Sequence, residues 1–77
     1  MGASVDATGL SPALSLVRLR QALERASTGE TVSFLSDASG LEEPLRRFIQ
    51  RAGHELLSSR EEGGGFLCSI RKGDAAD

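Results

Sequence analysis

Asp6-Ala7-Thr8-Gly9-Leu10-Ser11-Pro12-Ala13-Leu14 predicts the point where a short strand ends and the first helix begins. Gly9 tolerates a positive φ, Ser11 is a preferred N-cap residue, and Pro12 falls at the first helical position, where its missing N–H costs nothing. Such a turn points unpaired N–H groups and the positive end of the helix dipole at one spot, which favours an anion or a thiolate. The stretch itself supplies no nucleophile there.

Length and composition predict one small domain over residues 1–77, with an ordered core at about 4–72 and a flexible tail at 73–77. Three Phe and no Trp or Tyr leave no platform for stacking bases, which argues against a nucleic-acid partner. No apolar run approaches the roughly 20 residues that span a bilayer, and no signal peptide is recognisable, which predicts a cytoplasmic protein without a membrane partner. One Cys and one His predict neither a disulfide within the chain nor a metal site, and we expect no cofactor.

Hydrophobic periodicity predicts the order strand, helix, strand, helix, strand, strand. The expected strands are residues 5–7, 31–36, 55–60 and 66–71, after a loose tail at 1–4, and the expected helices are 11–26 and 41–52. Gly29 is expected to supply a left-handed stop after the first helix, Ser39 and Glu42 a capping box for the second, and Gly53 its end. Residues 61–65 are expected to form a glycine-rich loop that closes a hairpin between the last two strands. The order indicates an α/β two-layer sandwich, with both helices on one face of a four-stranded mixed sheet.

The alternation in the last strand places Cys68 on the core face, between Phe66 and Ile70. The other face of the sheet is expected to stay exposed, and Leu35, Leu56 or Leu67 on that face could form a protein interface.

Short motifs follow one another along the chain from about Val5 to Lys72. Asp6, Gly9 and Leu10 form an Asp-x-x-Gly-Leu pattern before the first helix. The further motifs are a basic residue in the first helix, short entries to the second and third strands, an acidic turn and a closing strand: Arg20, Gly29-Glu30-Thr31, Gly53-His54-Glu55-Leu56, Asp37 and Ile70-Arg71-Lys72. No single motif is specific, but in their order and spacing together they resemble the bacterial sulfur-carrier family of TusA and SirA-type proteins. The family's opening pattern, Asp-x-x-Gly-Leu-x-Cys-Pro-x-Pro, matches at Asp6, Gly9 and Leu10 without a gap.

The resemblance implies a cysteine at the start of the first helix that carries sulfur as a persulfide. In the ungapped register Pro12 stands at that position, and sliding by one residue places Ser11 there, so neither register provides a thiol. We therefore expect a non-catalytic binding or regulatory member of the family, whose partners are proteins of sulfur-transfer pathways. Its expected binding residues are those of the turn and the basic positions of the helix that follows it: Gly9, Leu10, Ser11, Pro12, Arg18 and Arg20.

Three residues allow a second interpretation. Ser11 could be a nucleophile, but that role needs an adjacent base, and the position of Ser11 is better explained by a helix N-cap. His54, next to Gly53, is better explained by capping or packing than by catalysis. Cys68 could have taken over sulfur carriage, which would make the chain an active carrier, although an inward strand position favours a small core residue.

A weaker alternative is a nucleic-acid-binding module, because the fold is similar to the C-terminal domain of bacterial translation initiation factor three. The arginines on the outer helix faces could then form a basic surface, or they could simply be solvated: Arg18, Arg25, Arg46, Arg47 and Arg51.

Overall fold

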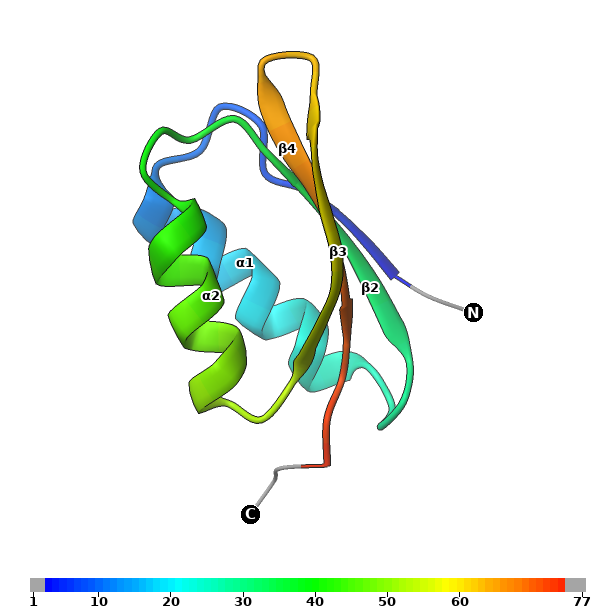
Figure 1. Cartoon of the computed structure of the whole chain (residues 1–77). Coiled ribbons are helices and arrows are strands. Elements are labelled where there is room, and N and C mark those ends of the chain that lie inside the picture. Colours follow the sequence, from blue (N-terminus) through cyan, green and yellow to red (C-terminus); the bar gives the residue numbers. More distant parts are fainter. Residues whose placement is uncertain (1–2, 75–77) are drawn as a thin grey trace.

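The computed structural model describes residues 3–74 (Figure 1), and Met1, Gly2 and residues 75–77 of the expected tails lie outside the described residues. The elements follow one another as predicted: β1 (Ala3–Asp6), α1 (Pro12–Arg25), β2 (Thr31–Ser36), α2 (Glu42–Arg51), β3 (Glu55–Glu62) and β4 (Gly65–Arg71).

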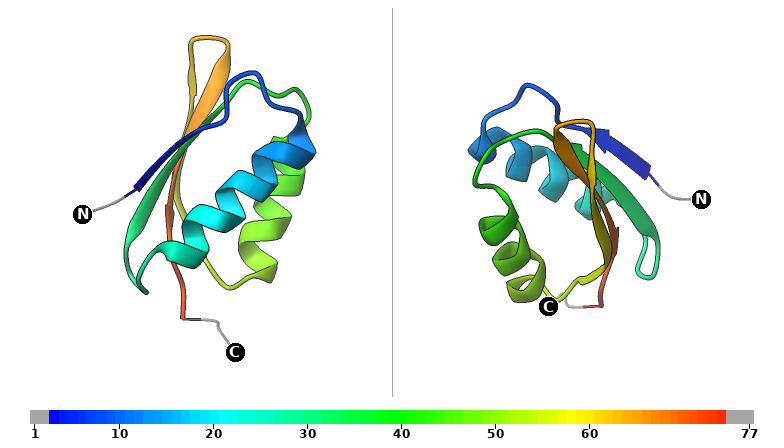
Figure 2. Two further views of the ribbon diagram at one scale, coloured as in Figure 1. Left: turned by 180° about the vertical axis from the view of Figure 1, so that it is seen from behind. Right: turned by 45° about the horizontal axis from the view of Figure 1, so that its top comes forward.

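The strands form one mixed sheet in the order β1-β2-β4-β3. β1 runs parallel to β2, whereas β4 is antiparallel to both of its neighbours. Both helices cover the same face of this sheet (Figures 1 and 2), which confirms the predicted two-layer α/β sandwich.

The core lies between the two layers and is built from alternate residues of the central strands. Phe34 of β2 and Phe66 of β4 have ring centroids 6.4 Å apart, and Leu19 and Ile49 from the two helices close over this face. The other buried apolar residues are Ala7, Leu23, Val32, Leu41, Leu45, Cys68 and Ile70. The predicted inward face of the last strand is therefore confirmed.

Two residues that the sequence assigned to the tails, Ala3 and Gly73, are held by distant segments of the chain. Ala3, assigned above to a loose tail, pairs with Val32, and the first strand ends at Asp6 instead of Ala7. Gly73, assigned to a flexible tail, donates its N–H to Nδ1 of His54 at 3.0 Å, and a Cβ atom there would lie 1.7 Å from the carbonyl oxygen of Gly53. Pairing with distant segments fixes these residues, and local sequence does not report such pairing.

The predicted hairpin between β3 and β4 is confirmed, but its loop is shorter than the predicted 61–65. β3 continues to Glu62, which pairs with Gly65, and only Gly63 and Gly64 turn the chain, with φ values of 51° and 87°. Two consecutive residues with positive φ suit the right-handed twist of a hairpin, and glycine adopts them without strain.

A register shift between Leu56 and Ser58 changes which leucine of β3 faces the core. Leu56 pairs with Ile70 and packs against the core, so its predicted outward position is wrong, and Leu57 is 44% exposed instead. Leu35 and Leu67 are half-buried on the alternate positions that face away from the helices.

Two of the predicted caps are not formed. α1 ends at Arg25 and is followed by Ala26 in an extended conformation, so Gly29 does not stop the helix but donates its N–H to the Lys72 carbonyl at 2.8 Å. α2 has Leu41 at its N-cap with no side-chain cap, so the Ser39 and Glu42 capping box is wrong.

The predicted end of α2 at Gly53 is confirmed. Gly53 donates its N–H to the Gln50 carbonyl at 3.1 Å, and His54 donates its N–H to the Ile49 carbonyl at 3.0 Å. This pair of bonds satisfies carbonyls that the helix end would otherwise leave free.

Candidate functional site

The turn between β1 and α1 is held by two aspartates, Asp6 at the end of β1 and Asp37 in the loop after β2. Gly9 has a φ of 81° and donates its N–H to Oδ1 of Asp37 at 2.9 Å, which ties this turn to the loop after β2 beside it (Figure 1). Asp6 Oδ1 accepts hydrogen bonds from the Thr8 hydroxyl at 2.6 Å and from the Thr8 N–H at 3.0 Å. These two bonds, the hydroxyl first, lower the pKa of Asp6.

The start of α1 is capped as the sequence predicts. Ser11 Oγ accepts a hydrogen bond from the Leu14 N–H at 3.2 Å, and Pro12 is the first helical residue. The buried Ser15 hydroxyl donates to the Ser11 carbonyl at 2.8 Å. Within residues 3–74 no imidazole or carboxylate bonds to Ser11 Oγ, so the hydroxyl has no base to activate it as a nucleophile.

The expected cluster of free N–H groups at this spot is largely absent from the described residues. Asp37 accepts from Gly9, Ser11 accepts from Leu14, and Pro12 has no N–H to offer. The Asp37 carboxylate also adds negative charge next to the helix start. The turn therefore offers an anion fewer free donors than the sequence predicts, although the positive end of the α1 dipole remains there.

Arg18 and Arg20, the two basic residues predicted to bind partners, lie apart from the turn and from each other. Along α1 they lie about 9 and 12 Å beyond Pro12, at 1.5 Å per residue. Arg18 lines a groove beside β1, whereas Arg20 lines a groove between α1 and α2. Only Gly9, Leu10, Ser11 and Pro12 remain together as one turn, in which Leu10 packs against the core and the other three are exposed.

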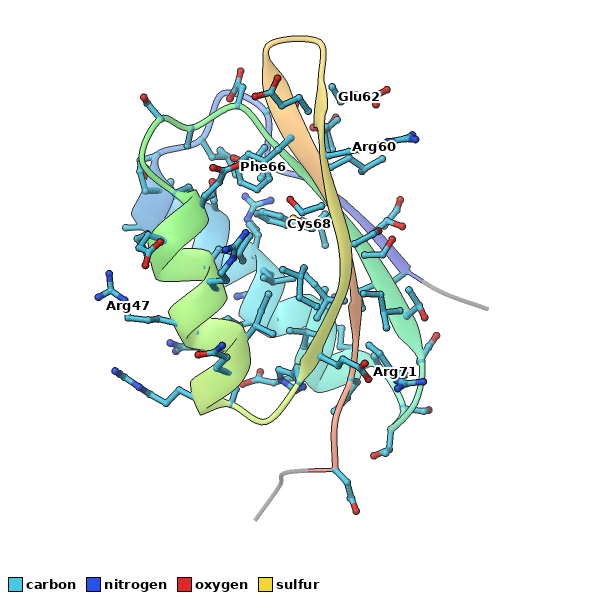
Figure 3. The ribbon with its side chains drawn as sticks, in the orientation of Figure 1. Arg47, Arg60, Glu62, Phe66, Cys68 and Arg71 are labelled. Atoms are coloured by element: carbon cyan, nitrogen blue, oxygen red, sulfur yellow. The ribbon has the colours of Figure 1, made fainter. Side chains whose placement is uncertain are left out.

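Cys68 lies inside the protein, between the sheet and the helices (Figure 3). It is 1% exposed, and its Sγ donates a long hydrogen bond to Ser59 Oγ at 3.5 Å. Burial raises the pKa of the Cys68 thiol. A reactive cysteine needs the opposite conditions, a lowered pKa and access for a partner.

The remaining motif residues gather at the far end of the sheet from the turn. Lys72 donates its N–H to the Glu30 carbonyl at 2.9 Å, and Glu55 forms an ion pair with Arg71. The His54 ring lies 6.2 Å from that of Phe48, and burial, with a smaller contribution from Lys72, lowers the pKa of His54. Neutral His54 can accept a hydrogen bond from the Gly73 N–H. The motif residues at this end of the molecule therefore hold the structure together.

Sequence reasoning missed two features of the surface. The contact of Asp37 with Gly9 follows from the parallel pairing of β1 and β2, which brings the loops after both strands to one edge of the sheet. The groove between the helices brings Arg20 next to Arg47 and Arg51, and helical spacing alone does not show which faces of two helices meet.

The described residues contain no helix long and apolar enough to cross a membrane. They also contain no cluster of three or more His, Cys, Asp or Glu side chains placed to hold a metal ion.

Comparison with known proteins gives a consistent result. The family model described as sulfurtransferase TusA matches residues 3–72. A sulfur carrier protein TusA from Allochromatium vinosum is 32% identical over 68 residues, which cover 88% of this chain and 90% of the relative. A sulfur carrier protein TusA from Pseudomonas putida is 31% identical over 70 residues, covering 91% and 88%, and a putative sulfur carrier protein from Neisseria meningitidis is 30% identical over 68 residues, covering 88% and 92%.

Proposed function

This chain belongs to the TusA sulfurtransferase family, and on that premise we propose that it is a binding or regulatory member that carries no persulfide of its own. Its partners are then proteins of sulfur transfer, and the whole chain acts as one binding domain.

The chemistry of sulfur transfer sets the requirement. An acceptor thiolate attacks the outer sulfur of a donor persulfide, a new S–S bond forms on the acceptor, the S–S bond of the donor breaks, and the donor leaves as a thiolate. The acceptor must therefore be a thiol that ionises and that a partner protein can reach.

One observation carries the proposal: the single thiol of this chain is buried in β4. The exposed start of α1, where the family resemblance expects the cysteine, has the Ser11 hydroxyl and the Pro12 ring. Proline has no nucleophilic side chain, and Ser11 Oγ is engaged as the helix cap. Burial and a raised pKa argue against Cys68 as a substitute carrier.

The turn Gly9-Leu10-Ser11-Pro12 is the surface that the proposal assigns to partners, and all of its residues except Leu10 are exposed. Hydrogen bonds to Asp37 and within the N-cap hold its backbone in one conformation, so a partner need not order it on binding. A member of the family without a thiol at the start of α1 could occupy, on a shared partner, the docking site of a relative that has the cysteine there.

Intact-mass measurement tests the absence of carriage. The wild-type chain, Cys68→Ser and Pro12→Cys are each incubated with a persulfide-loaded cysteine desulfurase. We expect no added sulfur on the wild type or Cys68→Ser, and a gain of about one sulfur atom on Pro12→Cys, whose thiol stands exposed at a helix start. A gain on the wild type that Cys68→Ser abolishes would establish Cys68 as a carrier and overturn the proposal.

Chemical-shift mapping tests the binding surface. The isotope-labelled chain is titrated with an unlabelled cysteine desulfurase, and we expect perturbed amide signals at residues 9–20. Absence of any perturbation there would contradict the assignment of this turn to partners.

A further inference from the structure

A groove on the outer surface of the helix layer combines an apolar floor with three arginines. It lies between α1 and α2 and has a volume of about 550 Å³. Its floor consists of three half-buried apolar residues: Leu16 of α1, Phe48 of α2 and Ala52, which follows α2. Leu16 and Phe48 also pack against the core. The exposed arginines that line the groove are Arg20, Arg47 and Arg51, and we call this site the arginine groove.

The charge of the arginine groove opposes that of the chain. The whole chain has a net charge of −2, yet no acidic residue lines the groove, and one acid, Glu24, lines the depression that adjoins it. Three cations gathered on one concave surface attract an anionic partner and raise its association rate.

The groove arginines differ in their ion pairing from the arginines on the open face of the sheet. On the open face of the sheet Arg60 pairs with Glu62, and Arg71 pairs with Glu55. For the three groove arginines the described residues provide no salt bridge. Arg47 projects from α2 away from the sheet (Figure 3). A bound carboxylate would therefore not have to displace an internal partner.

We propose that the arginine groove binds an acidic amphipathic helix of a partner protein, an inference that rests on the proposed binding function and gives that partner its chemistry. The groove follows α2 from Pro44 to Ala52, about 12 Å or two helical turns. Apolar side chains of the partner at i and i+4 would cover Leu16 and Phe48, while its carboxylates would reach the arginines on both sides. A nucleic-acid backbone matches the charge but leaves this apolar floor uncovered.

The test uses the full isotope-labelled chain and two synthetic helical peptides. Both have one leucine face, and the other face is glutamate in one peptide and lysine in the other. We expect the glutamate peptide to shift amide signals of α1 and α2 around the arginine groove, with an affinity that falls as salt rises, and the lysine peptide to bind at least about tenfold more weakly.

Matched variants locate the binding. The double variant Arg47→Glu with Arg51→Glu should lower the affinity for the glutamate peptide by about tenfold or more. The control Arg60→Glu, on the open face of the sheet, should leave this affinity within about twofold of the wild type. Equal binding of the two peptides, perturbation elsewhere, an unchanged affinity of the double variant, or no binding at millimolar peptide would each overturn the inference.

Two further results would identify a different occupant and so also overturn it. One is a single-stranded RNA oligonucleotide that binds in place of the peptide and is lost in the double variant. The other is a concentration-dependent dimer whose interface maps to the arginine groove. Sulfur uptake by the wild type would refute the proposed function without touching these measurements, so the two failures are distinguishable.

Discussion

The start of α1 and the inner face of β4 offer a sulfur atom opposite environments. The helix start is exposed and lies at the positive end of a helix dipole, but its residues are Ser11 and Pro12. The inner face of β4 holds the thiol of Cys68, but burial raises its pKa and leaves it 1% exposed. The comparison teaches that a thiol and the conditions that make it reactive are separate properties of a fold. Here they are found in different places.

The largest expected effect is a contrast in alkylation rate within one protein. In Pro12→Cys the new thiol should react with iodoacetamide at neutral pH at least about 100-fold faster than Cys68. Cys68 must wait for an opening that costs several kcal/mol, and each 1.4 kcal/mol is a factor of ten. Peptide mapping by mass spectrometry follows both sites in the same sample. Comparable alkylation rates at the two sites would mean that Cys68 is accessible in solution, and would contradict the difference between the two environments.

The next effect concerns what Cys68 does for stability. Cys68→Ser places a more polar group among Phe34, Phe66 and their neighbours, so it should lower the free energy of unfolding by about 1–3 kcal/mol. Urea unfolding measures the change. Ser59→Ala, which removes only the weak exposed partner of the thiol, is the matched control and should cost about 0.5 kcal/mol or less. A neutral Cys68→Ser would show that the thiol is not part of the packed core.

The cap at the helix start gives a smaller change. Ser11→Ala removes the acceptor of the Leu14 N–H and should destabilise the protein by about 1 kcal/mol, while Ser11→Gly should cost only a few tenths. Thermal or urea unfolding distinguishes them. Equal losses for the two variants would indicate that the hydroxyl does not cap the helix.

The smallest effect is a pH dependence at the turn. The pKa of Asp6 lies below its usual 3.8 because Thr8 donates two hydrogen bonds to it. A lowered folded pKa gives stability that is present above pH 3.8 and is lost as pH falls through the folded pKa. Thr8→Ala removes the hydroxyl bond, so the pKa of Asp6 should rise toward 3.8, as NMR titration of its carboxyl carbon would report. An unchanged titration would refute the role of the hydroxyl.

Local signals in the sequence predicted the elements that local physics controls. Apolar alternation located β2 and β4, helical spacing located α1 and α2, and the Gly53 signal located the end of α2. Two local caps, at Gly29 and at Ser39 with Glu42, were predicted but do not form. The other failures occur where distant segments meet. β1 extends to Ala3 because β2 lies beside it, and Gly73 is held by His54 from another part of the chain.

The candidate site divides in the same way. The N-cap at Ser11 and the inward Cys68 could be predicted, since capping and strand alternation depend on neighbours in the sequence. The Asp37 carboxylate beneath Gly9 and the gathering of Arg20 with Arg47 and Arg51 could not, because both depend on how separate elements pack.

The sequence by itself determined the family, the order of elements, the capped helix start and the position of the single thiol on the core side of β4. Hydrophobic periodicity and capping depend on residues that are close in the sequence, so they can be recognised without the tertiary structure. Only the tertiary structure decided that the turn satisfies its own donors and that three arginines share one apolar groove. Hydrogen bonds and charge gatherings between distant residues exist only once the layers have closed on each other.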